Sequence, residues 1–512
     1  MTPSKRASIR DHAWRSDFAR AYGEARFKDA AGLYELHASA SEAADIAIMA
    51  AQANMHAHPP VALRILLRVR TSSAHRRERI ACDVLLAEAY ARTRDFASAD
   101  AKLDAALKAA RKIGDLDLLA LVGYRCIRRH LFAEDPAAAR GFLNLARGGT
   151  SERARIYALY AETLILPYEE RVREQAERLV ELLRSLDPGG TAYMDVRAWA
   201  THTLAVLARE IPVAGAIAEV ERQLGGAPWP ADFAMNRFQA LKALGWAKAM
   251  QGDYFNAFRY LKAASATANT DSWNVVAACD RAYLARCLGE HRWSRAELDE
   301  AERLANGVDW QSTRGEERMG LLLLAELFSG IDTSRAAMYL ARHWELGEMA
   351  SALHYRHDAR LNAFAQYSTG IVELALGERK RGLAELRAAF ETFKRFGYDF
   401  RAARCLLAEY AVTRKSDLLT LAEERLRNYG QSWLAAELRG LGERNEISLP
   451  PMQQRVFAEI CKGKSNAEIA KTLERSPFTV SNHIKQIFKT FRVGSRSALV
   501  AEAIRRGLIK TS

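Results

Sequence analysis

The sequence predicts an all-α protein, in which a long α-solenoid of paired helices precedes a small unit of four helices. Three observations support this fold class. Ala, Leu, Arg and Glu are abundant and only 12 of the 512 residues are proline, a composition that favours helix. One spacing of small and large residues occurs four times before residue 400. Helix caps then divide residues 449–512 into four short segments.

The repeated spacing has small residues at offsets 0 and 12, Leu at offset 16 and Ala at offset 19. Small residues at offsets 0 and 12 allow two antiparallel helices to approach closely, and offsets 16 and 19 share one face of the second helix. Offset 7 is Gly in three copies and Arg94 in the first, and a Gly there ends the first helix at a tight turn. The four copies begin at Ala87, Gly245, Ala282 and Gly370.

This pattern resembles the tetratricopeptide repeat, and the resemblance covers much of residues 80–440. The second and third copies start 37 residues apart, slightly more than the period of about 34 residues of that repeat. Residues 107–240 and 302–369 follow the pattern less clearly, so degenerate helix pairs are expected there, and residues 1–80 are also expected to be helical. Stacked helix pairs form a solenoid whose groove binds a peptide, a protein or a small molecule.

The charge of the chain is concentrated near its C-terminal end. Residues 447–512 hold twelve basic and four acidic side chains, which places +8 of the net charge of +13 there and leaves +5 on the first 446 residues. A small basic unit attached to a large, nearly neutral one favours a polyanionic partner such as DNA.

Capping residues predict the first two helices of this basic unit. Pro450 and Pro451 open the first helix, and Gly463 closes it. Ser465 stands three residues before Glu468, which is the spacing of a capping box and predicts the start of the second helix.

The third and fourth helices are predicted in the same way. Ser476 caps the third helix, with Pro477 at its first position, and Ser495 caps the fourth, which ends at Gly507. The apolar residues of the third helix repeat at helical spacing, so they are expected to face the core. These residues are Val480, Ile484, Ile487, Phe488 and Phe491.

The second and third helices, joined by a short turn, have the helix-turn-helix pattern, in which the third helix enters the major groove of double-stranded DNA. Asn pairs bidentately with adenine and Lys donates to guanine. The side chains expected to face the bases are Ser481, Asn482, Lys485 and Lys489. Those at the flanks, suited to phosphate contacts, are Thr479, His483 and Arg496.

This unit resembles the LuxR-type (GerE-like) DNA-binding domain over about residues 447–510. The resemblance implies that the unit binds DNA as a homodimer through its fourth helix, and that base contacts fall on Ser481, Asn482 and Lys485. The residues that carry the resemblance are Ser465, Asn466, Glu468, Ile469, Ala470, Leu473, Ser476, Thr479, Val480, His483, Ile487, Val493 and Arg496.

Three positions depart from the family pattern. The family usually has Thr in place of Pro450, an acidic residue in place of Arg455 and Lys or Arg in place of Ser481. The lack of a cation at Ser481 weakens one DNA contact that the resemblance implies, so the target sequence and the affinity for DNA stay open.

No catalytic residue, cofactor or metal site is predicted. Residues 463–465 read Gly-Lys-Ser, like the end of a phosphate-binding loop, but Ala458 stands where that loop requires Gly. His354 and His357 would share a helix face, but no third metal ligand accompanies them, and His56 and His58 are expected in a loop. We therefore expect no enzyme activity.

A cytoplasmic protein without membrane contact is expected. The first 20 residues lack the apolar stretch of a secretory signal. The longest apolar run, Met319–Ile331, contains Glu326 and is too short to span a bilayer. The six cysteines are scattered and are expected to be reduced.

These observations predict a DNA-binding transcriptional regulator. Residues 1–440, called the repeat region below, would sense a ligand or protein partner, residues 441–448 would form a linker, and residues 449–512 would bind DNA. The alternative is an adaptor whose C-terminal unit has lost DNA binding, for which Ser481 is one indication.

Overall fold

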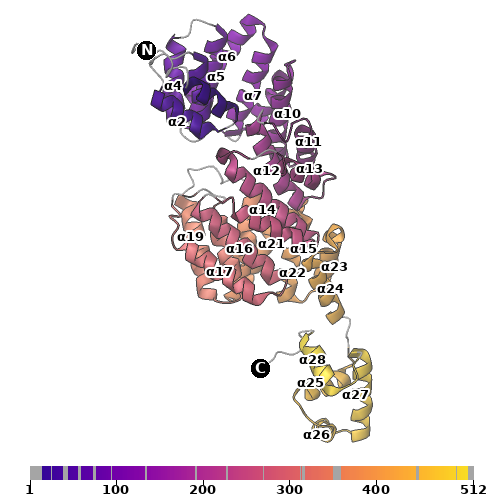
Figure 1. Cartoon of the computed structure of the whole chain (residues 1–512). Coiled ribbons are helices and arrows are strands. Elements are labelled where there is room, and N and C mark those ends of the chain that lie inside the picture. The colour runs from indigo at the N-terminus through magenta and orange to yellow at the C-terminus, as the bar shows by residue number, and fades with distance from the viewer. Residues whose placement is uncertain are drawn as a thin grey trace. The chain divides into compact units, whose positions relative to one another are not determined.

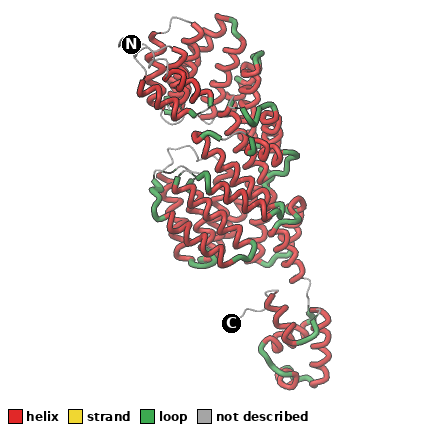
Figure 2. The backbone as a smooth tube through the Cα atoms, viewed as in Figure 1, coloured by secondary structure: helices red, strands yellow, loops and turns green. Residues whose placement is uncertain are grey.

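The computed structural model describes residues 14–505 except 25, 38–43, 56–58, 73–75, 94, 133–134, 191–192, 227–228, 269, 312, 314–316, 350–358, 446–448 and 492. Every regular element in this part of the chain is a helix (Figure 2), which confirms the expected all-α class. Contacts divide the chain into two compact units. One holds residues 1–249 and 253–399, and the other holds residues 250–252 and 400–512.

The first unit consists of consecutive helices connected by short turns (Figure 1). A helix over residues 14–23 is followed by α2 (Phe27–His37), α3 (Ala44–Asn54), α4 (Pro59–Ser72), α5 (Arg76–Arg92), α6 (Phe96–Ile113), α7 (Leu116–Phe132), α8 (Pro136–Gly141), α9 (Leu143–Arg147), α10 (Glu152–Ile165), α11 (Val172–Arg184), α12 (Met194–Glu210), α13 (Ala216–Leu224), α14 (Ala234–Met250), α15 (Tyr254–Ser265), α16 (Asp271–Cys287), α17 (His291–Ala305), α18 (Met319–Phe328), α19 (Thr333–Met349), α20 (Ala359–Ala375) and α21 (Arg379–Arg395).

The four copies of the repeated spacing form the helix pairs α5–α6, α14–α15, α16–α17 and α20–α21. Small residues at offsets 0 and 12 bring the two helices of a pair together, as expected. A Cβ atom added to Gly370 would lie 2.9 Å from the carbonyl oxygen of Gly382, which is closer than real Cβ contacts. In α16–α17 the Ser294 hydroxyl donates a hydrogen bond of 2.9 Å to the carbonyl of Ala282.

Glycine at offset 7 ends the first helix of three pairs. Gly252, Gly289 and Gly377 have φ of +83°, +78° and +89°, a left-handed conformation that side chains with a Cβ rarely adopt. Arg94, at offset 7 of the first copy, lies outside the described residues, as do His56, His58, His354 and His357.

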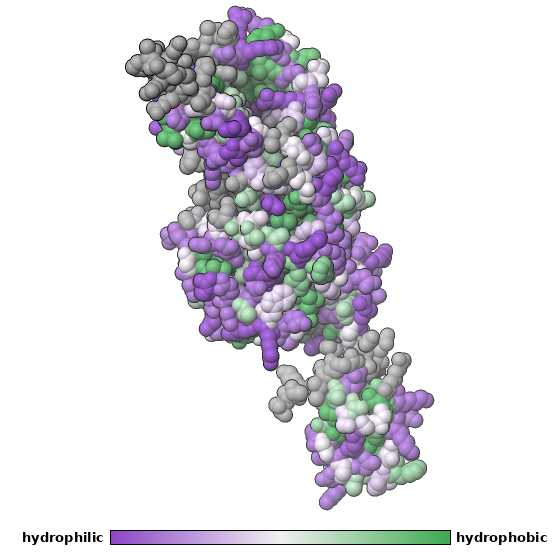
Figure 3. All heavy atoms as spheres, in the orientation of Figure 1, coloured by the Kyte–Doolittle hydropathy of each residue, from purple (hydrophilic) through white to green (hydrophobic). Residues whose placement is uncertain are grey.

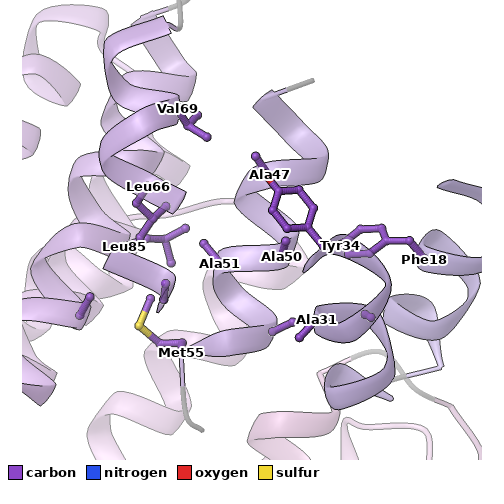
Figure 4. Close-up of a cluster of buried hydrophobic side chains, with 14 of the residues drawn as sticks. Phe18, Ala31, Tyr34, Ala47, Ala50, Ala51, Met55, Leu66, Val69 and Leu85 are labelled. Atoms are coloured by element: carbon purple, nitrogen blue, oxygen red, sulfur yellow. The ribbon is translucent and has the colours of Figure 1, made fainter. Parts of the chain in front are cut away.

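The expected degeneracy of residues 107–240 is visible as a broken second helix. After α7, the chain forms two short helices, α8 and α9, in place of one long partner. Both pack against α7, so together they take the position of the second helix of a pair. Toward the start of the chain, side chains from residues 14–23 and from α2 to α5 share one hydrophobic core (Figure 4).

The second unit contains α22 (Asp399–Thr413), α23 (Asp417–Arg425), α24 (Trp433–Asn445), α25 (Pro451–Cys461), α26 (Asn466–Thr472), α27 (Pro477–Phe491) and α28 (Arg496–Arg505). Helix α24 continues through residues 441–445, so the expected linker is helical there, and its residues 446–448 lie outside the described part of the chain. The contacts also group α22–α24 with the C-terminal helices, although the sequence assigned them to the repeat region.

Hydrophilic side chains cover most of the visible face, and hydrophobic ones appear in small separate patches (Figure 3). Among the described helices, none is both long enough and apolar enough to span a membrane. Met319–Ile331 includes α18, whose residues are largely buried within the repeat region.

Candidate nucleic-acid interface

Helix α25 begins and ends where the sequence predicted. It starts at Pro451 after Pro450, and Gly463 follows its end with a φ of +81°. Val456 and Ile460 on its inner face are buried in the core that α25, α26, α27 and α28 share. This core makes the four helices one packed unit.

The predicted capping box at the start of α26 is present. The Ser465 hydroxyl accepts from the Glu468 backbone N–H at 3.3 Å, and the Glu468 carboxylate accepts from the Ser465 N–H at 2.7 Å. The hydrogen bond from the Ser465 backbone holds the pKa of Glu468 below its usual value. Two backbone donors that the first turn of a helix leaves unpaired are thereby satisfied.

A tight turn connects α26 to α27. Glu474 adopts a left-handed conformation with a φ of +52°, and the Arg475 N–H donates to the Ala470 carbonyl at 2.9 Å. The Ser476 hydroxyl then accepts from the Thr479 N–H at 3.1 Å, so Ser476 caps α27 as predicted. This turn and cap fix the direction in which α27 leaves the domain core.

The inner face of α27 holds it against the rest of the domain. Phe491 stacks on Phe457 of α25, with ring centroids 5.2 Å apart and an angle of 19° between the ring planes. Phe488 is half-buried against the same core. The other inward residues, all buried, are Val480, Ile484 and Ile487. The helical spacing in the sequence therefore identified this face correctly.

The outer face of α27 presents polar side chains. Asn482, Lys485 and Lys489 are exposed, and Ser481 is half-buried. These side chains follow one another at helical spacing, so they form a single stripe, which we call the α27 stripe. The flanking residues Thr479 and His483 are half-buried beside it.

Phe478 extends the α27 stripe by one turn, and the sequence analysis did not single it out. Its side chain is 76% exposed, although it is large and apolar. It stands three and four residues before Ser481 and Asn482, so it occupies the same face of the helix. The signal that could have identified it is an aromatic residue at a polar position of the helical pattern.

Arg496 differs in its surroundings from the other expected DNA contacts. Its guanidinium donates to the backbone carbonyl of Lys464 and to the side-chain oxygen of Asn466, so it joins the start of α28 to the start of α26. Lys464 and Lys462 in turn contact Glu459, and their hydrogen bonds lower the pKa of that carboxyl. Part of the basic charge of this unit is therefore paired within the domain.

Comparison with known proteins identifies the domain that these helices form. Residues 448–503 match the family described as bacterial regulatory proteins, luxR family. This segment is therefore a LuxR-family helix-turn-helix domain, as the sequence predicted.

Relatives with curated descriptions match over a small share of the chain. Proteins of Mycobacterium bovis and of two strains of Mycobacterium tuberculosis, described as candidate HTH-type transcriptional regulators, are 39% identical over 79 residues. That match covers 14% of this chain and 9% of the length of each relative.

A solved structure, the APC/C hetero-tetramer Cut9-Hcn1, is similar over 83% of this chain and 92% of its own, with a TM-score of 0.27 and 14% identity. A TM-score of this size supports no inference about this protein.

Proposed function

We propose that this protein is a DNA-binding transcriptional regulator in which α27 enters the major groove. The observation that carries the proposal is the exposed α27 stripe on a domain of a DNA-binding regulatory family. The stripe points away from the domain core, and the turn at Glu474 together with the Ser476 cap fixes the direction of α27.

Each residue of the α27 stripe has a role in this proposal. Asn482 pairs with an adenine, Lys485 donates to a guanine, and Ser481 donates to a neighbouring base edge. Phe478 contacts the methyl group of a thymine, which is the apolar contact that the major groove offers. Lys489 and the flanking Thr479 and His483 contact phosphates and hold the register of the helix on the duplex.

The proposal assigns the repeat region a sensing role. Helix pairs stacked in this way present binding surfaces, and a binding array joined to a DNA-reading domain is suited to control that domain. A ligand or protein partner would change dimerisation on DNA or the exposure of α27, and a bacterial regulator of this kind would act in the cytoplasm.

The test is binding of the full-length protein to genomic DNA fragments, including its own promoter region, at two salt concentrations. A protein that contacts several phosphates loses affinity steeply as salt rises. A double variant, Asn482→Ala with Lys485→Ala, should lose sequence-selective binding. Thr490→Ala, exposed on the same helix but away from the stripe, is the matched control and should bind as the wild type does.

The experiment also distinguishes the DNA-binding regulator from the alternative, an adaptor that has lost DNA binding. If the full-length protein does not bind at low salt, residues 440–512 alone are tested. Binding by this segment would mean that the repeat region masks α27, as a sensing role requires. Absence of binding by both proteins would exclude DNA recognition and leave the adaptor.

A further inference from the structure

The positive charge of the first 446 residues is concentrated in one short part of them. Residues 59–113, which contain α4, α5 and α6, hold twelve basic and six acidic side chains, a net charge of +6. The first 446 residues carry +5 in total, so the others among them sum to −1. A positively charged surface is therefore expected on these three helices.

The three helices place many of these cations at one edge. Helix α4 packs against α5 and α5 against α6, and only residues 73–75 and 93–95 connect them, so consecutive helices run antiparallel. The end of α4, the start of α5 and the end of α6 therefore lie together. The ion pair between Arg77 in the first turn of α5 and Asp115, two residues after α6, agrees with this arrangement. The six exposed cations here, called the basic edge, are Arg68, Arg76, Arg79, Lys108, Arg111 and Lys112.

Most of the basic edge has no counter-charge within the protein. Apart from Arg68, its cations form no side-chain hydrogen bond or ion pair in the described part of the chain. Exposed arginines on other helices of the same unit have a carboxylate one turn away: Arg178 contacts Glu181 at 2.8 Å, and Arg303 contacts Glu300 at 2.6 Å. The charge of the basic edge is therefore left for a partner to neutralise.

Two cations of the basic edge do not help the helix that carries them. Arg76 and Arg79 lie in the first turn of α5, where the helix macrodipole disfavours positive charge. At the opposite edge of the same helices, Asp95 caps the start of α6, and Asp100 pairs with Arg129 of α7. Like charges gathered at one edge repel one another in the free protein, and a bound polyanion removes that repulsion.

The basic edge has dimensions suited to a nucleic-acid backbone. Axes of neighbouring packed helices are about 8–10 Å apart, so three helix ends span roughly 20 Å. Double-stranded DNA carries one negative charge per about 1.7 Å of its axis, so a duplex offers several phosphates over this length. The arginine fork matches phosphate oxygens bidentately, and lysine adds a point charge. Such contacts hold a duplex without reading its bases.

We propose that the basic edge binds the phosphate backbone of double-stranded DNA outside the site that α27 reads. DNA is favoured over other polyanions because a domain of a DNA-binding regulatory family belongs to the same chain. A duplex held by that domain is present at a high effective concentration for any other cationic surface of the chain. The inference rests on the proposed function and adds to it a sequence-independent DNA contact made by the repeat region.

The test measures how the DNA affinity of two full-length variants depends on salt, with the genomic fragment that binds best and with an unrelated duplex of equal length. The edge variant carries Arg76→Gln, Arg79→Gln, Arg111→Gln and Lys112→Gln. Each phosphate contact contributes about 0.9 to the slope of log affinity against log salt, so the slope of the edge variant should be shallower by about 3 on both DNAs. The control variant loses the same charge from exposed positions of α15 and α17 and should keep the wild-type slope. Its substitutions are Arg259→Gln, Arg292→Gln, Arg295→Gln and Arg303→Gln.

A smaller variant, Arg76→Gln with Arg79→Gln, protects the test against a folding failure. Loss of two cations from the first turn of α5 should leave the melting temperature unchanged or raise it, and the slope should become shallower by about 2. Equal slopes in the edge and control variants would overturn the proposal and leave the role of α27 intact. A shallower slope in the edge variant, in a protein that prefers no DNA sequence, would support the basic edge and contradict the proposed regulator. If the wild type bound neither DNA at low salt, both proposals would be wrong.

Discussion

Phe478 is the residue of α27 whose chemistry least suits its surroundings. An aromatic side chain that is 76% exposed at the start of a helix gains nothing from the folded domain. It stands on the same face as Asn482 and Lys485, where a protein that enters the major groove meets base edges. In the proposed complex, the base edges of the major groove would bury this side chain.

Phe478→Ala should weaken binding to the preferred DNA site without weakening the fold. A lost thymine-methyl contact costs about 1 kcal/mol, or roughly fivefold in affinity, at low salt. Melting temperature should be unchanged because the side chain is exposed. Titrations with DNA that lacks the thymine methyl group would check that Phe478 contacts this group. Phe478→Ala and the wild type should bind such DNA with equal affinity. Equal affinity of both proteins for unmodified DNA would contradict it.

Arg496 should act on the fold more than on DNA. Because its guanidinium connects α28 to the α25–α26 turn, Arg496→Ala should cost about 1.5–3 kcal/mol, the range for hydrogen bonds to a charged group. Hydrogen exchange at the amides of α26 should accelerate in the variant. Lys489→Ala, an exposed cation of the α27 stripe, is the control and should leave exchange unchanged while weakening DNA binding. If hydrogen exchange in α26 were unchanged in Arg496→Ala, Arg496 would not stabilise the fold, and its expected role as a phosphate contact would stand.

At the scale of the element, the helix pairs depend on glycine at their closest approach. Gly382 and Gly370 place α20 and α21 so close that a Cβ atom on Gly382 would lie 2.8 Å from the Leu374 side chain and 2.9 Å from the Gly370 carbonyl. Gly382→Ala should destabilise the protein by about 1–3 kcal/mol, as overpacking does, and lower its Tm by several degrees.

Gly32→Ala is the matched control for that substitution. Gly32 lies in the middle of α2, and a Cβ atom there would meet nothing within 4 Å. Alanine should therefore stabilise α2 by roughly 0.5–1 kcal/mol through its helix propensity. If Gly382→Ala melted at or above the wild-type temperature, helices α20 and α21 would be able to move apart without losing free energy of unfolding.

The capping box of α26 should make that helix sensitive to acid. The pKa of Glu468 is lowered in the folded protein by the hydrogen bond from Ser465, so its contribution is complete above the usual glutamate value of 4.5 and is lost as pH falls through the folded pKa. Hydrogen exchange in α26 should therefore accelerate below that value. Glu468→Gln keeps an acceptor that does not titrate, so exchange in this variant should depend less on pH. If hydrogen exchange in α26 depended on pH equally in the wild type and in Glu468→Gln, the acid sensitivity would come from Glu459, whose pKa is also lowered.

The features that could be predicted from the sequence are those fixed by neighbouring residues. The Ser465–Glu468 box spans four residues, and Gly370 and Gly382 are 12 apart in one helical hairpin, so local patterns contain all the required information. The contact of Arg496 with Lys464 joins residues 32 apart, and the Glu88–Arg125 pair joins different helix pairs. Such contacts depend on how elements pack, which residue spacing does not specify.

At the scale of the whole molecule, the chain divides into two compact units, to which the proposed function assigns two separate tasks. The first unit holds the repeated helix pairs, and the second unit carries the α27 stripe. In the proposed regulator, occupancy of one unit alters the DNA affinity of the other, so the coupling between them is a measurable free energy. The ligand-free and ligand-bound proteins must then differ in DNA affinity.

The last prediction concerns the oligomeric state on DNA. The resemblance implies a dimer through α28, where Ala501 is exposed and its neighbour Leu499 is buried in the core. Ala501→Arg should leave the domain folded, because it adds a side chain to an exposed position, but place two like charges at the dimer contact. Gel mobility and sedimentation should show two wild-type chains per site on half-sites about 10 base pairs apart. The variant should occupy single half-sites and bind the full site at least tenfold more weakly, since each 1.4 kcal/mol of lost contact is about tenfold. Two bound copies of Ala501→Arg at wild-type affinity would place the dimer contact elsewhere in the chain.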